Sequence, residues 1–333
     1  MAETLKKPFV ALLFVLFLGA IFRFMLISDL PPGLYPDEAM NGNNALEALR
    51  NTNLSAKNGP SFGWKIFYPE NNGREGLFIN IQALSVYTFG NTAWALRIVS
   101  SLFGTLTILG LYLVAKELFW GIQTPSRDIS ERKKKVIHPH LNMYNPGAIA
   151  LFAAFFIATN YWHINFSRIG FRAIMLPLVC TFGFYWLLKA LRTGKISSAV
   201  LGGIIFGLGF HTYIAFRIAP LVIAFVVLWY SWLWWKERGR EAIAGVTKTC
   251  APCILALFLF ATFVTALPIG YYFLQHRGDL VGRQTQVSVF GSDNPVKALA
   301  LSTIKTFGMF NIIGDCNQRH NYKCKPELFW PVG

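Results

Sequence analysis

Charged residues are scarce in this chain. Only 14% of its 333 residues are Asp, Glu, Lys or Arg, whereas 54% are hydrophobic and 16% are aromatic. Because a soluble domain carries about one quarter charged residues, this composition argues against an ordinary soluble protein. It indicates a chain that is surrounded by lipid over much of its surface.

Long apolar runs supply candidate membrane helices. A helix needs about 20 mainly apolar residues to cross the hydrocarbon core, and about seven segments approach that length. We therefore expect an all-α, polytopic membrane helix bundle with spans near 9–27, 93–119, 146–162, 171–190, 197–214, 218–235 and 251–273. No small-residue cleavage site follows the first run, so it is not expected to be a cleaved signal peptide.

Acidic residues are missing from the central part of the chain. There is no Asp or Glu from Arg132 through Lys236, so this part can supply neither a carboxylate base nor a carboxylate metal ligand. Seven crossings would leave two long segments, 28–92 and 274–333, outside the cytoplasm. Chemistry on that side must use their acids, which are Asp29, Asp37, Glu38, Glu47, Glu70, Glu75, Asp279, Asp293, Asp315 and Glu327.

The basic residues are distributed unevenly over the predicted loops. The net charge is +15, and a cytoplasmic N-terminus would place 14 Lys and Arg in the segments 1–8, 120–145, 189–197 and 236–249. The two short outer loops would hold only Arg168, Arg172 and Arg217. This is the positive-inside pattern. The basic run Arg132–Lys135 is therefore interpreted as a topology anchor and not as a nucleic-acid site.

The two outer segments contain short helical patterns. Ala39–Arg50 predicts a helix with Asp37 as its N-cap, and the composition of Asn51–Gly73 indicates a loop. Gly76–Phe89 is apolar but too short to span, which predicts a helix at the membrane interface. Pro295–Phe310 predicts a second interfacial helix from its apolar periodicity. We expect a transmembrane domain over 1–273, including the loop 28–92, followed by an outer segment over 274–333.

The arginines of the outer loops have no acidic residue near them in the sequence. Arg168, Arg172 and Arg217 would all lie at the outer ends of spans. Guanidinium groups bind phosphate through charge-assisted, often bidentate hydrogen bonds, so these residues are candidate phosphate ligands. The alternative is ordinary snorkelling towards lipid head groups.

Other polar residues offer further candidates. Asp37 and Glu38 are adjacent, so one can stabilise a helix start while the other takes part in chemistry; alternatively, both only stabilise the helix. His320 lies between Arg319 and Asn321 and is a site candidate, whereas His163 is interpreted as an interfacial polar residue.

The five cysteines do not identify a function. Cys250 and Cys253 have redox-motif spacing but open a membrane helix, so redox activity is not expected. Cys316 and Cys324 would form a disulfide if their side of the membrane is oxidising, and otherwise remain free thiols.

Five motifs follow one another along nearly the whole chain: Pro32–Ala39, Gly73–Phe78, Phe89–Arg97, His163–Arg172 and Gly314–Asn321. In order and position they resemble the GT-C glycosyltransferases of family 39, which include dolichyl-phosphate-mannose–protein mannosyltransferases and aminoarabinose transferases. Members of that family continue through several more membrane helices. The chain is therefore expected to correspond to their N-terminal part, and as an isolated product it is either active or inactive.

The resemblance implies an enzyme that transfers a sugar from a polyprenyl-phosphate carrier to an acceptor on a protein, a glycolipid or a cell-wall polymer. It implies that Asp37 is the catalytic carboxylate, beside Glu38, and that Glu75 lines the site. Residues that would hold the carrier phosphate are Arg74, Arg168, Arg172, Arg217 and Arg319, together with His320 and Asn321. No cofactor is required, although a divalent metal at Asp37 and Glu38 is compatible, and no nucleic-acid partner is expected.

Two other functions fit a polytopic chain. A transporter or lipid flippase would need ionisable residues within the membrane or broken helices in matching halves, and neither pattern is evident. A non-catalytic scaffold is the third alternative.

Overall fold

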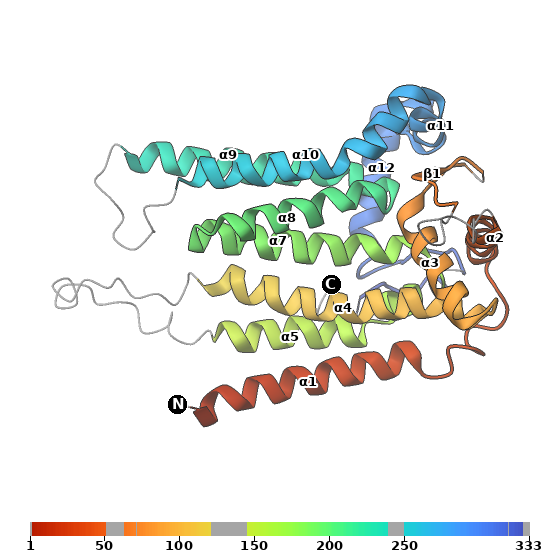
Figure 1. The fold of residues 1–333 in the computed structure, drawn as a ribbon, viewed down its shortest axis with the longest axis horizontal. Coiled ribbons are helices and arrows are strands. Elements are labelled where there is room, and N and C mark those ends of the chain that lie inside the picture. Colours follow the sequence, from red (N-terminus) through yellow and green to blue (C-terminus); the bar gives the residue numbers. More distant parts are fainter. Residues whose placement is uncertain are drawn as a thin grey trace, which may run out of the picture. The chain divides into compact units, whose positions relative to one another are not determined.

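The computed structural model describes residues 2–50, 63–70, 72–120, 145–238, 250–318 and 320–328. In this part the protein is mostly helical (Figure 1). The α-helices are α1 Ala2–Phe24, α2 Pro36–Arg50, α3 Gly76–Phe89, α4 Ala93–Trp120, α5 Pro146–Thr159, α6 Tyr161–Arg168, α7 Met175–Thr193, α8 Ile196–Leu208, α9 Ala219–Arg238, α10 Ala251–Gln275, α11 Arg277–Val287 and α12 Pro295–Gly308. Four 3-10 turns are η3 Arg172–Ile174, η4 Gly209–His211, η5 Ile214–Ile218 and η6 Val289–Gly291.

Within the described residues, three helical stretches are long and apolar enough to cross a membrane: Ala93–Trp120, Arg172–Thr193 and Ala251–Gln275. A fourth is obtained if α5 and α6, which are bent by 57° at their junction, count as one span. Other apolar helices, such as Pro8–Phe24, have at most 17 residues and are about 25 Å long, shorter than the roughly 30 Å core. The helical membrane-type fold is confirmed, but the number of about seven crossings is not.

The described chain divides into two compact units. The first unit comprises Met1–Leu18, Leu106–Phe156 and Leu176–Leu267, and the second comprises Gly19–Thr105, Ile157–Met175 and Pro268–Gly333. The second unit contains both of the predicted outer segments, and with them most of the candidate site residues.

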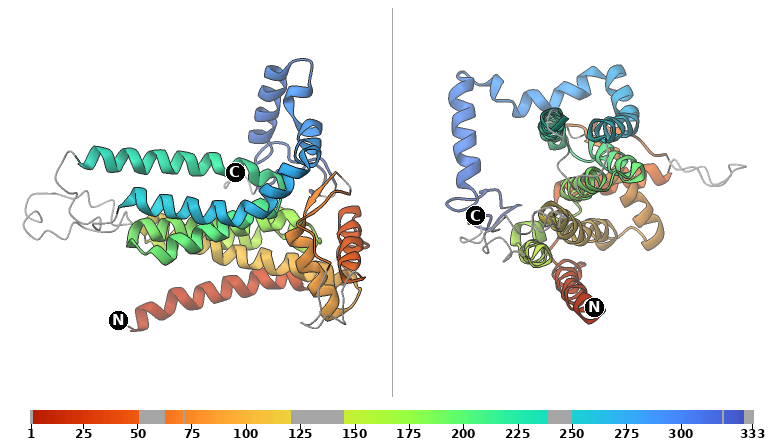
Figure 2. Two further views of the ribbon diagram at one scale, coloured as in Figure 1. Left: turned by 45° about the horizontal axis from the view of Figure 1, so that its top comes forward. Right: turned by 90° about the vertical axis from the view of Figure 1, so that its left-hand side faces the viewer.

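The first unit has an aromatic and aliphatic core. Phe206 of α8 packs with Phe216 of η5 and Phe258 of α10, and all three side chains are almost fully buried. A Cβ at Gly203 would lie 2.4 Å from the carbonyl oxygen of Phe258. Glycine therefore lets α8 and α10 run in close contact (Figure 1; Figure 2), as small residues do in membrane bundles.

The first outer segment is a packed structure in the second unit. Ala45 and Ala48 of α2 pack against Ile79 and Ala83 of α3 and are almost completely buried. Tyr68 of the short strand β1 (Phe67–Tyr68) completes this cluster. The small side chains of α2 allow its backbone to lie close to α3, which fixes the position of the acidic start of α2.

The start of α2 differs from the prediction. The helix begins at Pro36, and the carbonyl oxygen of Tyr35 accepts a hydrogen bond from the N–H of Ala39 at 2.9 Å. Proline suits the first helical position because its missing N–H would have no partner there. The prediction that Asp37 is the N-cap is therefore wrong. Asp37 lies in the first turn, near the positive end of the helix dipole.

The two predicted outer helices are present. α3 covers Gly76–Phe89 as expected, and α12 ends at Gly308, two residues before the predicted Phe310. Their placement at the membrane interface stays a prediction. The helix α11 was not predicted. The strand β1 lies within Asn51–Gly73, which was predicted to be a loop, and pairs antiparallel with β2 (Arg74–Glu75).

Gly76 is tightly enclosed where β2 meets α3. Its N–H donates to the carbonyl oxygen of Ile66 at 2.8 Å, and a Cβ would lie only 2.0 Å from the carbonyl oxygen of Lys65. These are backbone atoms and cannot rotate away, so Gly76→Ala should destabilise the protein by about 1–3 kcal/mol. Thermal unfolding of the detergent-purified protein measures the effect.

The matched control for this substitution is Gly270→Ala, because a Cβ at Gly270 would meet no atom within 4 Å. Alanine favours a helix over glycine by up to about 1 kcal/mol, so this control should be neutral or slightly stabilising. Equal unfolding temperatures for the two variants would contradict the close approach at Gly76.

Candidate functional site

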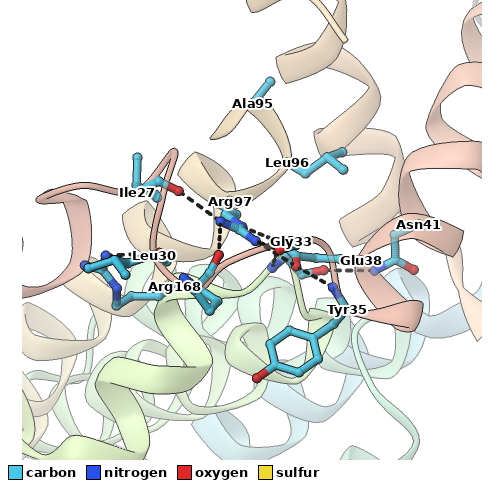
Figure 3. A network of polar contacts seen from close by, with 12 residues as sticks. Ile27, Leu30, Gly33, Tyr35, Glu38, Asn41, Ala95, Leu96, Arg97 and Arg168 are labelled. Atoms are coloured by element: carbon cyan, nitrogen blue, oxygen red, sulfur yellow. Dashed lines mark hydrogen bonds and ion pairs between the residues drawn. The ribbon is translucent and has the colours of Figure 1, made fainter. Parts of the chain in front are cut away.

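A buried ion pair lies at the start of α2. The Nε of Arg97 is 2.7 Å from the Oε1 of Glu38, and each side chain is only 1% exposed. Arg97 also donates to the carbonyl oxygens of Ile27, Pro31 and Gly33 in the turn after α1 (Figure 3). Arg97 of α4 thus joins this turn to α2.

Both carboxylate oxygens of Glu38 accept hydrogen bonds. Oε1 accepts from the N–H of Gly170 at 3.0 Å as well as from Arg97, and Oε2 accepts from the N–H of Tyr35 at 3.1 Å (Figure 3). The second of these contacts is half of a capping box. A carboxylate that is buried and bonded in this way can position its neighbours, but it is poorly placed to receive a proton from a substrate.

The neighbouring carboxylate, Asp37, is in a different environment. Its side chain is partly exposed, and its charge acts on the guanidinium of Arg74. Burial lowers the pKa of Arg74, as does the nearby charge of Arg172, while Glu70 and Asp37 raise it. Asp37 therefore lies at the edge of a cluster that contains cations.

Arg74 is fixed by two amide side chains of α2. Its Nη1 donates to the Oδ1 of Asn41 at 2.8 Å and its Nη2 donates to the Oδ1 of Asn44. The Nε of Arg74 is buried and has no hydrogen-bond partner among the described residues. This donor is thus oriented without using all of its hydrogen-bonding capacity.

Glu75 and Arg172 lie close together beside Arg74. The Nε of Arg172 is 3.5 Å from the Oε2 of Glu75, and the side chains are 5% and 3% exposed. Arg172 therefore has a carboxylate counter-ion in the folded protein, although no acidic residue lies near it in the sequence. Its carboxylate partner comes from β2, far from Arg172 along the chain, so inspection of the neighbouring sequence could not reveal it.

Arg168 has a structural role. Its terminal nitrogens donate to backbone carbonyl oxygens at and beyond the end of α1, those of Phe22, Met25, Leu26 and Leu30. A cation at this end of a helix is favoured by the helix dipole. These contacts occupy the donors that a carrier phosphate would need, which argues against Arg168 as a phosphate ligand.

The structure thus brings together Asp37, Arg74, Glu75 and Arg172, and it engages Glu38 and Arg168 in structural contacts. Arg217 lies in η5 of the first unit, and Arg319 lies outside the described residues.

The last described loop holds the remaining predicted site residues. The Nδ1 of His320 is 2.8 Å from the Oδ2 of Asp315, and the imidazole lies against the ring of Phe166 at a centroid distance of 5.2 Å. The Nδ2 of Asn321 donates to the carbonyl oxygen of Lys325 and braces the loop. Of the two alternatives for the outer cysteines, the structure has the Cys316–Cys324 disulfide; Cys250 and Cys253 are also bonded.

His163, interpreted as an interfacial residue, is buried within the protein, and its depth in the membrane stays a prediction. Its Nδ1 lies 2.8 Å from the Nη2 of Arg23, whose side chain is fully buried. Arg23 also donates to the carbonyl oxygens of Ile157 and Ala158, each at 3.0 Å. These carbonyls lie beside the bend between α5 and α6, so Arg23 satisfies acceptors next to the break in the helix.

Sequence reasoning missed several residues of the site. Arg97, Asn41, Asn44 and Gly170 build it through contacts between distant segments, and only Arg97 and Gly170 lie in one of the five motifs. An arginine near the start of an apolar run, such as Arg97, could have indicated a site residue, because a charge in or near the membrane requires a partner.

Among the described residues, no group of three or more His, Cys, Asp or Glu side chains could hold a metal ion. No protein-family model matches the chain, and no curated protein matches it significantly.

Proposed function

We propose that this protein is an inverting glycosyltransferase that moves a sugar from a polyprenyl-phosphate carrier to an acceptor hydroxyl. The observation that carries the proposal is the different state of two adjacent acids. Glu38 is buried and bonded through both oxygens, whereas Asp37 is partly exposed and within electrostatic range of Arg74. One carboxylate is therefore built into the fold while its neighbour lies at the edge of a cluster that contains cations, as a single-base reaction requires.

In the proposed reaction Asp37 accepts the proton of the acceptor hydroxyl. The hydroxyl oxygen attacks the anomeric carbon and forms the new glycosidic bond with inversion. The bond between the anomeric carbon and the phosphate oxygen breaks, and the polyprenyl phosphate leaves with the electron pair. Because phosphate is a good leaving group, it needs no acid to protonate it, unlike the leaving group in glycoside hydrolysis, which uses two carboxylates.

We assign the leaving phosphate to Arg74 and Arg172, because these two candidate cations lie within electrostatic range of each other and Arg74 lies within range of Asp37. Arg74 is held by two asparagines and its buried Nε has no partner in the described part of the chain. A fixed donor stabilises developing negative charge without a reorganisation cost. Arg217 and Arg319 remain candidates from the sequence alone.

The resemblance to family 39 of the GT-C glycosyltransferases is supported by how its motifs meet. Glu38 belongs to the first of the five motifs, and it bonds Arg97 of the third and Gly170 of the fourth. Segments that were matched independently along the sequence thus converge on one carboxylate. We include membership of this family in the proposal.

The proposed topology has a cytoplasmic N-terminus, seven crossings of the cell membrane and an extracytoplasmic site. The uneven distribution of Lys and Arg supports this orientation. Each predicted span also coincides with helical structure, although several of these helices are short.

Deletion of the gene tests the proposal. We expect a polyprenyl-phosphate sugar to accumulate, as measured by mass spectrometry of lipid extracts, and one glycoconjugate to lose that sugar. A flippase would also let a lipid-linked sugar accumulate, so the purified protein is then assayed in detergent, where no compartments exist. Transfer of the accumulated sugar in micelles supports a transferase. An unchanged lipid and glycoconjugate profile would end the proposal.

A further inference from the structure

Glu327 is a buried carboxylate that the proposed reaction does not use. Its side chain is 4% exposed, and its Oε1 accepts a hydrogen bond from the N–H of Asp315 at 2.8 Å. Its Oε2 is buried without a hydrogen-bond partner among the described residues. A buried polar atom in this state costs free energy, and such an atom in a native structure calls for a water, an ion or a ligand.

The groups around Glu327 have the chemistry of a polar binding site. The Asp315–His320 pair lies next to it, joined at 2.8 Å. Tyr161 is within electrostatic range of Glu327 and of two further tyrosines, Tyr35 and Tyr322. The pKa of Glu327 is raised, mainly by burial and further by the neighbouring Asp315 carboxylate. The hydrogen bond from the N–H of Asp315 and the charge of His320 lower this pKa, but by less.

The loop that carries these groups is fixed in shape. The Cys316–Cys324 disulfide closes it, and a Cβ at Gly314 would lie 2.0 Å from the carbonyl oxygen of Lys325 and 3.0 Å from the Oε1 of Glu327. The position of the Glu327 carboxylate is therefore set by the backbone. A preorganised acceptor of this kind loses little conformational entropy when it binds a ligand.

The loop is attached to α6 and to the segment after it, which also carries residues of the proposed active site. Asn160 donates to the carbonyl oxygen of Glu327 at 3.3 Å, and Asn165 donates to that of His320 at 2.9 Å. The His320 ring also lies 6.2 Å from that of Phe171. Phe171 stands between Gly170, which bonds Glu38, and Arg172, which pairs with Glu75. All of these residues belong to the second unit.

We propose that Glu327, with the Asp315–His320 pair, forms a binding site for a polyhydroxylated group. A carboxylate oxygen accepts hydrogen bonds from hydroxyls, and binding sites commonly combine aromatic groups with a few oriented polar groups. Here the His320 ring lies against Phe166 and Phe171, and Tyr161 is within electrostatic range of Glu327. The inference rests on the proposed function, because the ligand is either the sugar of the donor or the hydroxyl-bearing part of the acceptor.

Glu327→Gln tests the site in the purified protein. Glutamine keeps the shape and an oxygen for the N–H of Asp315, but it removes the charged acceptor. Since a hydrogen bond to a charged group contributes about 1.5–3 kcal/mol, we expect KM for one substrate to rise about tenfold or more, with little change in kcat. A rise for the lipid-linked sugar alone assigns the hydroxyls to the donor, and a rise for the acceptor alone assigns them to the acceptor.

Asp293→Asn is the matched control, because Asp293 is an exposed acid in the same outer segment. It should leave both KM values unchanged. If Glu327→Gln does not fold, as judged by size-exclusion chromatography, His320→Ala replaces it, since His320 belongs to the proposed site and its side chain is 26% exposed. A folded variant of either residue with both KM values unaltered overturns the proposal.

The two proposals can fail separately. If the wild-type protein transfers no sugar, the proposed function has failed, and the site is then examined through the thermal unfolding of the wild-type protein and Glu327→Gln with free hexoses at millimolar concentration. A hexose that stabilises the wild-type protein but not the variant supports the site. No stabilisation of the wild-type protein by any hexose overturns it.

Discussion

Replacement of Asp37 by Asn is expected to lower the rate of sugar transfer by about 10²–10⁴-fold, the contribution of a general base. The amide has nearly the shape of the carboxylate but cannot accept the proton of the acceptor hydroxyl. Because Asp37 is partly exposed and outside the buried Glu38–Arg97 contacts, the variant should fold like the wild-type protein. Initial rates with the lipid-linked donor measure the effect, and thermal unfolding tests the fold.

Asp29→Asn is the matched control for this experiment. Asp29 is an exposed acid of the same outer segment, and its Oδ2 accepts a hydrogen bond from Ser28 at 2.8 Å. Its replacement should leave the rate unchanged. Donor binding should also survive in Asp37→Asn, because the loss is in proton transfer. A wild-type rate in Asp37→Asn would remove Asp37 as the base and make Glu75 the next carboxylate to test.

Local structure was well predicted where it depends on local pattern. The apolar run Gly76–Phe89 and the periodic segment after Pro295 both form helices close to the expected residues. The bend between α5 and α6 was not predicted, because it depends on a partner elsewhere in the chain. The buried guanidinium of Arg23 accommodates carbonyl groups at the bend, and nothing in the sequence around Asn160 indicates this contact.

The candidate site shows the same division between local and distant interactions. The sequence located its acids, since the central part of the chain has none, but it could not assign their roles. Asp37 and Glu38 are neighbours of similar chemistry, and their difference arises from Arg97 and Gly170, which approach Glu38 alone. The roles of the arginines could not be assigned from the sequence either, because their partners are distant along the chain. Arg168 donates to backbone carbonyls near the end of α1, and Arg172 pairs with Glu75.

Of the substitutions proposed for this protein, the loss of the Glu38 charge should lower the free energy of unfolding the most. Glu38→Gln leaves the Arg97 guanidinium buried without a carboxylate, and breaking a buried pair in this way costs about 3–5 kcal/mol. The transition temperature should fall by at least about 5 °C, judged by the usual scaling of stability with temperature. Thermal unfolding of the detergent-purified protein measures it. Glu47→Gln is the control on the same helix, because its ion pair with Lys65 is solvent-exposed and should contribute at most about 1 kcal/mol.

A second substitution separates a positioning role of Glu38 from a catalytic one. Replacing Arg97 by Met in the Glu38→Gln variant removes the uncompensated charge, so it should recover part of the lost stability, as removal of both members of buried ion pairs does. If Glu38 only positions the start of α2, turnover of the folded protein should recover in parallel, since Asp37 is retained. A double variant that is stable but as slow as Asp37→Asn would instead show that the Glu38 carboxylate itself acts on the substrate.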